Sequence, residues 1–301
     1  MLPMALDLKT FCAKVRVSDG ATWTELQRRG LPPGVPGEKW NADAPHHVEA
    51  VARSYLEAGS DLVLTNTLGA NRVALDPHGL ADRAAELAEA GVRVARQAAG
   101  KEGLVFASLG PTGRIVMMED LPRERFVSAL TEAADALAWG GADAIVLETF
   151  NELDELRIAL AAARKTGLPV VACMTFASGR DGTMTLMGNK PADFARVAKA
   201  GGAAAVGANC GAGPENFLKV TRLLREATDL PIWVKPNAGL PKVVKGKTIF
   251  PMGPEEFASY VPQLLEAGAN IVGGCCGTTP DHIRAVRKAV DEQKKGIGCR
   301  E

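Results

Sequence analysis

The sequence lacks a charge excess and lacks long apolar runs. Lys plus Arg and Asp plus Glu both number 35 in 301 residues, so the formal net charge is +0. Without a basic excess there is no overall field to attract nucleic acid or an anionic membrane. No apolar run approaches the roughly 20 residues of a membrane-spanning helix, and the first residues do not resemble a signal peptide. We therefore expect a cytoplasmic protein that binds neither nucleic acid nor membrane.

Histidine and aromatic residues are also scarce. The aromatic fraction is 5%, and there are only four histidines. They lie in or beside predicted helices and loops, and we predict solvated surface residues rather than ligands for His46, His47, His78 and His282. Trp139 and Trp233 are predicted to belong to the core. Residues 20–45 are rich in Pro and Gly, which predicts a loop over one end of the fold.

Short apolar runs alternate with helical stretches along the whole chain. The predicted strands are Lys14–Ser18, Asp61–Thr65, Leu104–Leu109, Ala144–Leu147, Pro169–Met174, Ala204–Ala208, Ile232–Lys235 and Asn270–Gly273. The predicted helices are 46–57, 82–99, 124–139, 152–166, 191–200, 214–227, 254–267 and 280–294. Strand–helix units in series, with no linker between them, predict a single-domain (β/α)8 TIM barrel over residues 1–301. A doubly wound sheet is disfavoured because the turn after the first strand is not G-x-G-x-x-G.

Three of the six cysteines follow predicted strands. Cys210 follows the sixth strand, and Cys275 and Cys276 follow the eighth. Strand carboxyl ends meet on the face where such barrels carry active sites. Three thiolates suit Zn²⁺ and leave its fourth position open, as in catalytic zinc sites. The alternative is that they are small buried apolar residues. The three together favour one zinc ion per chain.

The remaining cysteines match no ligand motif. We predict a structural or exposed position for Cys12, Cys173 and Cys299.

Several motifs at the strand ends resemble one known family. They are Asp19-Gly20, Thr65-Asn66-Thr67, Gly207-Ala208-Asn209-Cys210, Pro236-Asn237-Ala238-Gly239 and Gly273-Gly274-Cys275-Cys276-Gly277-Thr278-Thr279-Pro280. They resemble the homocysteine S-methyltransferase family, and most closely the homocysteine-binding domain of cobalamin-dependent methionine synthase. The resemblance covers about residues 13–292 and implies a (β/α)8 barrel that binds zinc and homocysteine.

The resemblance also implies roles for individual residues. The three thiolates would hold a catalytic zinc to which the substrate thiol binds. Asp19 and Glu148 would face the ammonium of homocysteine, and the backbone N–H groups of Gly20 and Ala21 would receive its carboxylate. The residues themselves support Glu148, because a carboxylate that ends an apolar strand is seldom there for packing. Three further residues complete the expected site: Asn66 and Thr112 line the cavity, and Asn237 lies near the metal and could fill its fourth position.

The expected chemistry is methyl transfer to sulfur. A free thiol is mostly protonated at neutral pH, and zinc coordination deprotonates it. The resulting thiolate can attack an electrophilic methyl group without a general base. The predicted reaction moves a methyl group to homocysteine and gives methionine.

The methyl donor is predicted to be a methylated corrinoid. Thr65-Asn66-Thr67 and Ser178-Gly179-Arg180-Asp181-Gly182-Thr183 look most like the cobalamin-dependent branch. The nearest string to the corrinoid-binding D-x-H-x-x-G is Asp76-Pro77-His78-Gly79, and its spacing is wrong. The cobalamin would therefore arrive in trans, free or on a separate corrinoid protein.

Three alternatives stay open. One is S-methylmethionine or betaine as the donor. Another is a corrinoid-linked methyltransferase that acts on a different methyl donor or thiol. The third is a non-catalytic zinc-binding scaffold, against which the acidic pair and the open zinc position argue.

Overall fold

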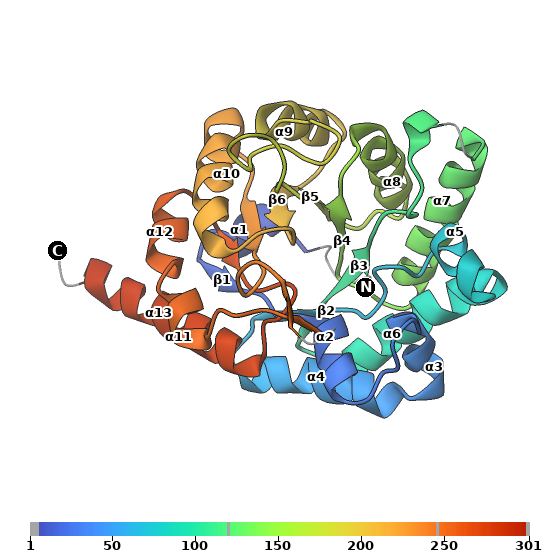
Figure 1. Ribbon diagram of the computed structural model, residues 1–301, viewed down its shortest axis with the longest axis horizontal. Helices are drawn as coiled ribbons and strands as arrows, with labels where there is room; N and C mark the ends of the chain where they lie inside the picture. The colour runs from blue at the N-terminus through green and yellow to red at the C-terminus, as the bar shows by residue number, and fades with distance from the viewer. Residues whose placement is uncertain (1–5, 119–120, 245–246, 299–301) are drawn as a thin grey trace.

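A parallel sheet of eight strands curls into a barrel (Figure 1). The computed structural model describes residues 6–118, 121–244 and 247–298. The strands of the sheet are β1 (Arg16–Val17), β2 (Leu62–Leu64), β3 (Leu104–Leu109), β4 (Ala144–Phe150), β5 (Val170–Met174), β6 (Ala205–Asn209), β7 (Ile232–Lys235) and β10 (Ile271–Val272). Their order is β1-β10-β7-β6-β5-β4-β3-β2. The prediction of a (β/α)8 barrel is confirmed.

Helices surround the sheet on its outside (Figure 1). The main ones are α4 (Pro45–Glu57), α6 (Ala84–Ala99), α7 (Arg123–Trp139), α8 (Leu153–Lys165), α9 (Pro191–Ala200), α10 (Pro214–Ala227), α11 (Pro254–Ala258), α12 (Val261–Glu266) and α13 (Pro280–Gly298). Shorter elements are α1 (Leu8–Phe11), α2 (Thr22–Arg28), α3 (Trp40–Asp43), α5 (Arg72–Leu75), η1 (Gly37–Lys39), η2 (Asp76–His78), η3 (Ala81–Arg83), η4 (Val116–Met118) and the hairpin of β8 (Lys242–Val244) and β9 (Lys247–Ile249). No helix in the described ranges is long and apolar enough to cross a membrane.

The barrel interior follows the two-residue period of its strands. In β4, Ala144 and Val146 belong to one buried cluster, which also holds Phe106 and Trp233. The alternate residues of β4 belong to the larger cluster beneath the helices. Because successive side chains point to opposite faces, Glu148 follows Val146 on the inward face. Phe106 and Trp233 stack with ring centroids 6.0 Å apart and form an apolar floor below it.

The barrel closes between β1 and β2 through one main-chain hydrogen bond and two side-chain carboxylates. The N–H of Asp61 donates to the carbonyl of Val17 at 2.7 Å, and Oδ2 of Asp61 accepts the N–H of Val17 at 2.7 Å. Oδ2 of Asp19 accepts the N–H of Leu64 at 2.7 Å. Arg287 of α13 pairs with Asp61 at 2.5 Å. We call these contacts the β1–β2 seam.

Some details differ from the sequence-based expectations. The helix predicted at 254–267 is divided into α11 and α12, and residues 20–45 contain α2, η1 and α3. Trp139 is 84% exposed, so its predicted core position is wrong: it ends α7 on the outer surface, whereas Trp233 is fully buried as predicted.

One histidine prediction is wrong, and two of the cysteine predictions fit the structure. His282 is 5% exposed, so its predicted surface position is wrong. The backbone N–H of Thr279 donates to its Nδ1, and its Nε2 lies 3.0 Å from the carbonyl oxygen of Met252, so it joins two loops. Cys12 and Cys173 are buried, which fits their structural interpretation, and Cys299 lies outside the described residues.

Candidate metal and substrate site

Three thiols gather where β6 and β10 end. The sulfur atoms of Cys210, Cys275 and Cys276 all lie within 4.8 Å of one another, and those of Cys210 and Cys276 are 3.9 Å apart. Tetrahedral zinc with Zn–S bonds of about 2.3 Å places its sulfur ligands just under 4 Å apart. The donor set and its spacing therefore fit a soft metal ion.

The backbone that presents these thiols is unusual. Cys210 has φ of 61°, in the left-handed region that non-glycine residues rarely adopt. Its N–H bonds the carbonyl of Lys235 at 3.1 Å, and the N–H of Cys275 bonds that of Pro236 at 2.7 Å. Both cysteine loops are thus fastened to the end of β7. Strain of this kind persists only where the surroundings hold it, and it concentrates at functional sites.

The thiols are poorly ionised by themselves. The pKa of Cys275 is raised, most by its interaction with Cys210, and burial adds to the rise. At Cys210, Cys275 lowers the pKa, but Cys276 and burial outweigh this and bring the pKa to about 12. Three crowded, buried thiols need a cation before they can all become thiolates.

Asn237 lies on the loop between the cysteine segments. Its N–H donates to the carbonyl of Ala212, and the next N–H, of Ala238, donates to the carbonyl of Cys276 at 3.0 Å. The side chain is 3% exposed, and its Oδ1 has no hydrogen-bond partner among the described residues. A buried oxygen without a donor is an available ligand atom.

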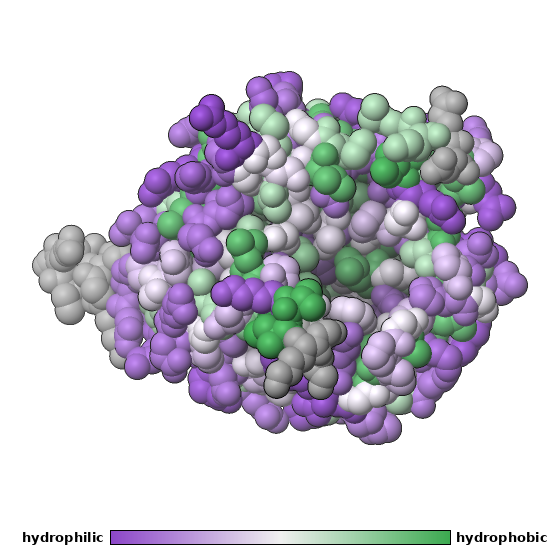
Figure 2. Space-filling view, in the orientation of Figure 1, coloured by the Kyte–Doolittle hydropathy of each residue, from purple (hydrophilic) through white to green (hydrophobic). Residues whose placement is uncertain are grey.

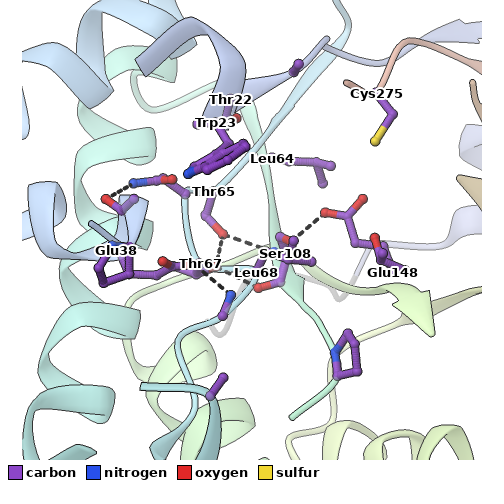
Figure 3. A pocket seen from close by; sticks show the side chains of 18 of the residues that line it. Thr22, Trp23, Glu38, Leu64, Thr65, Thr67, Leu68, Ser108, Glu148 and Cys275 are labelled. Carbon is purple, nitrogen blue, oxygen red and sulfur yellow. Dashed lines mark hydrogen bonds between the residues drawn. The ribbon is translucent and has the colours of Figure 1, made fainter. Parts of the chain in front are cut away.

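A cavity of about 530 Å³ opens beside the thiols. Figure 3 shows Glu148 and Cys275 on one side of it and Trp23 and Glu38 on the other. Trp23 and Leu68 line the cavity and are 50% and 40% exposed, so its rim is apolar. Figure 2 shows hydrophobic residues around a hollow near the centre of this face.

Glu148 reaches the cavity from β4. Oγ of Ser108 donates to its Oε1, and Asn209 donates to its Oε2 at 3.4 Å. The next residue, Thr149, has φ of 69°, and its N–H bonds Oδ1 of Asn209 at 2.8 Å. Burial raises the pKa of Glu148, against the opposing effects of Lys235 and Ser108. A buried carboxyl in this state gains stability from an incoming cation.

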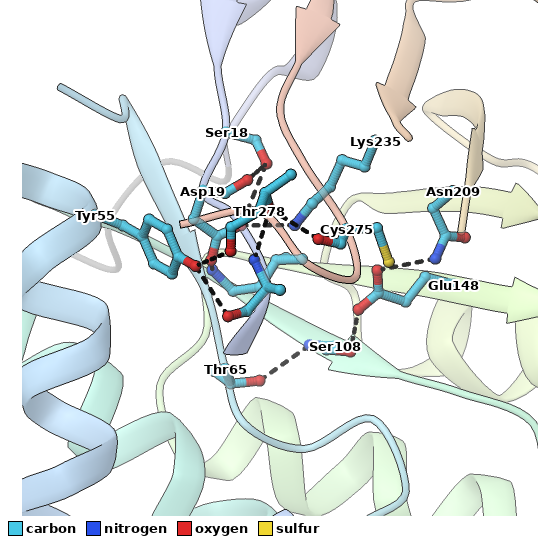
Figure 4. Close-up of polar contacts among 12 residues, drawn as sticks. Ser18, Asp19, Tyr55, Thr65, Ser108, Glu148, Asn209, Lys235, Cys275 and Thr278 are labelled. Carbon is cyan, nitrogen blue, oxygen red and sulfur yellow. Dashed lines mark hydrogen bonds and ion pairs between the residues drawn. The ribbon is translucent and has the colours of Figure 1, made fainter. Parts of the chain in front are cut away.

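Asp19 stands behind the cavity wall and is already paired. Its Oδ1 lies 2.6 Å from Nζ of Lys235, and its Oδ2 holds the Leu64 N–H of the seam. Figure 4 shows Lys235 beside Asp19, and of the two only Lys235 is among the residues that line the cavity. Both Asp19 oxygens are engaged without a substrate.

Gly20 and Ala21 line the cavity at the start of α2. The Ala21 N–H donates to Oγ1 of Thr278 at 3.1 Å. A Cβ on Gly20 would lie 2.6 Å from the ring of Tyr55, so only glycine fits there.

Asn66 and Thr112 also line the cavity. The amide of Asn66 donates to the carbonyl of Gly37 and to Asn41, and Thr112 donates to Glu155. Both side chains therefore hold loops in place as well as shaping the wall.

Sequence reasoning missed Lys235 and Ser108. Lys235 ends the apolar strand Ile232–Lys235, two residues after the inward Trp233, and a charged residue in that register was the available signal. Ser108 stands in the same relation to Phe106 on β3. Neither belongs to a motif that pointed to the site.

Three thiols, a buried carboxyl and a lysine lie at the carboxyl ends of the strands, which is where TIM-barrel enzymes carry their active sites, so the protein belongs to the class of TIM-barrel enzymes. The comparisons identify the family within it. Residues 16–290 match the homocysteine S-methyltransferase family, and the chain belongs to that family. Methyl transfer to homocysteine sulfur is the activity for which this family is named.

Two curated relatives are named methionine synthase. The chain is 35% identical to that of Mycobacterium leprae over 94% of its own length, and 34% identical to that of Mycobacterium tuberculosis over 96%. It spans only 25% and 26% of these relatives, about a quarter of their length.

Solved structures of other proteins have a similar fold. The metallated form of the homocysteine methyltransferase MmuM from Escherichia coli has a TM-score of 0.77 and 27% identity, over 94% of this chain and 99% of that one. A methyltransferase from Methanosarcina mazei, at 14% identity and a TM-score of 0.59, shares the fold.

Proposed function

We propose that the protein transfers a methyl group from a methylated corrinoid, supplied in trans, to the thiol of homocysteine with the help of one bound zinc ion. The observation that carries the proposal is the convergence of the Cys210, Cys275 and Cys276 sulfur atoms within 4.8 Å beside the cavity. The product is methionine.

The metal assignment rests on the chemistry of the donors. Three thiolates prefer zinc over harder cations, and Asn237 offers a neutral oxygen for the fourth position. Zinc, when bound, supplies a Lewis acid that keeps a substrate thiol ionised at neutral pH. The left-handed backbone of Cys210 and the fastening of both loops to β7 hold the three sulfur atoms in place.

The residues of the cavity orient the amino-acid end of the substrate. Glu148 accepts the ammonium, with Ser108 and Asn209 fixing its two oxygens. Both oxygens of Asp19 are engaged, so we assign Asp19 an indirect part through Lys235. The N–H of Gly20 faces the carboxylate, while Ala21 supports the turn through Thr278.

The corrinoid donor is supported by the likeness of Thr65-Asn66-Thr67 and of residues 178–183 to the cobalamin-dependent branch, and by the open, apolar rim. Methyl transfer needs the donor carbon within about 3–3.5 Å of the sulfur, so the donor must dock at the cavity mouth. Trp23 and Leu68 offer an apolar surface there for a large donor or for a separate corrinoid protein.

S-methylmethionine is the second candidate donor. The solved chain of the homocysteine methyltransferase MmuM from Escherichia coli is matched over 99% of its length, so a chain of one such barrel is a homocysteine methyltransferase there. A small sulfonium donor would need no docking partner.

Side-by-side turnover tests the proposal. Zinc-loaded protein is given homocysteine with methylcobalamin, S-methylmethionine or betaine, and methionine is measured. Cys275→Ser is the matched control that removes one sulfur ligand. Methionine from methylcobalamin, absent in the control, supports the proposal. Rapid turnover of S-methylmethionine, with methylcobalamin inert, would show that the proposed donor is wrong. The proposed thiol site would stand.

A further inference from the structure

Lys235 is a buried cation with donors to spare. Its side chain is 3% exposed, and an ammonium carries three N–H donors. In the described part of the chain the hydrogen-bond partner of Nζ is Asp19 alone, at 2.6 Å. Its ion pair with the buried carboxylate of Asp19 holds the side chain as an ammonium. A buried charged group with unused N–H donors is stabilised when an acceptor binds them.

The cavity presents two charges of opposite sign. Lys235 reaches it from β7 and Glu148 from β4, and both line it. Figure 4 shows Lys235 extending toward Asp19, with Glu148 and Cys275 on its other side. An α-amino acid is a zwitterion, and its ammonium and carboxylate match Glu148 and Lys235.

The main chain offers the substrate carboxylate fewer N–H donors than the sequence suggested. The Ala21 N–H is used by Thr278, so of the two N–H groups expected to receive the carboxylate only that of Gly20 is left. A carboxylate held in a desolvated cavity needs a cation as well as a hydrogen bond.

We propose that Lys235 binds the carboxylate of the thiol substrate and makes the site selective for an amino-acid thiol. Asp19 positions Lys235 from behind. This inference rests on the proposed function, since it assumes that the thiol of homocysteine lies at the three cysteines.

Binding of three thiols tests it. Homocysteine, 3-aminopropanethiol, which lacks the carboxylate, and 4-mercaptobutyrate, which lacks the ammonium, are titrated calorimetrically into zinc-loaded protein. The parent should prefer homocysteine over 3-aminopropanethiol by roughly tenfold to a hundredfold, the scale of a hydrogen bond to a charged group. Lys235→Met should abolish that preference and keep the preference over 4-mercaptobutyrate. Arg114→Met, which removes an exposed cation that lines the same cavity, should keep both preferences.

Equal weakening of all three thiols by Lys235→Met would overturn the proposal, because a structural role does not distinguish them. A lost preference in Arg114→Met alone would move the carboxylate to Arg114. If Lys235→Met fails to fold because Asp19 is left unpaired, the double variant Asp19→Asn/Lys235→Met removes both charges and gives the same comparison. If no thiol binds the parent protein, the proposed function is wrong, and this outcome differs from a failure of the role of Lys235 alone.

Discussion

At the scale of single residues, the three cysteines act as one group. Changing Cys210, Cys275 or Cys276 to Ser replaces a soft thiolate by a hydroxyl that does not ionise at neutral pH. We expect each variant to retain less than half of the parent's zinc, roughly one ion per chain, and to lose most methionine formation. Metal analysis after desalting measures this. Cys173→Ser, a buried cysteine of β5 outside the cluster, is the control and should keep its zinc. Full zinc in all three cluster variants would contradict the assignment.

His282 makes stability depend on pH. Burial lowers its pKa from 6.5, and the Thr279 N–H donates to its Nδ1, so the folded protein holds it neutral. Above pH 6.5 the histidine is neutral in both states. As pH falls below that value the unfolded chain takes up the proton first, so the free energy of unfolding decreases. Urea unfolding at several pH values should show this decrease. It should be smaller in His282→Gln, and an equal decrease in both would contradict the interpretation.

At the scale of elements, β6 has no room for a side chain at Gly207. A Cβ there would lie 2.3 Å from the carbonyl oxygen of Trp233 and 2.9 Å from the sulfur of Cys173. We expect Gly207→Ala to cost about 1–3 kcal/mol, as overpacking does, because backbone atoms must move. Chemical denaturation measures the loss. Adding Trp233→Phe should not restore stability, because the closest clash is with the main chain, and restoration would show that the indole ring was the obstacle.

The elements were also what the sequence predicted best. The strand–helix alternation gave the barrel, and the two-residue period of Ala144, Val146 and Glu148 could place that carboxyl inward. The cysteines were predictable because they directly follow strands. The ion pair of Asp19 with Lys235 and the burial of His282 were not, since they depend on distances between elements far apart in the chain. The core position predicted for Trp139 was wrong because a residue type alone does not show whether neighbouring elements cover the end of its helix.

At the scale of the whole molecule, the β1–β2 seam decides how firmly the barrel is closed. Asp61 accepts the Val17 N–H and pairs with Arg287 of the last helix. Asp61→Ala should lower the free energy of unfolding by about 1.5–3 kcal/mol, because a hydrogen bond to a charged group is lost. Asp61→Asn keeps an acceptor and should lose less. Thermal unfolding of the two variants measures the difference, and equal loss would show that charge alone closes the seam.

The carboxylate of Asp19 has one oxygen on the Leu64 N–H and the other on Lys235. The same side chain therefore takes part in the closure of the barrel and holds Lys235, which lines the cavity. A ligand that binds only the closed form makes opening rarer. Deuterium uptake at the Leu64 amide should then slow when the cavity is filled. The main-chain amide of a residue in the cavity wall would then report occupancy without any label on the ligand.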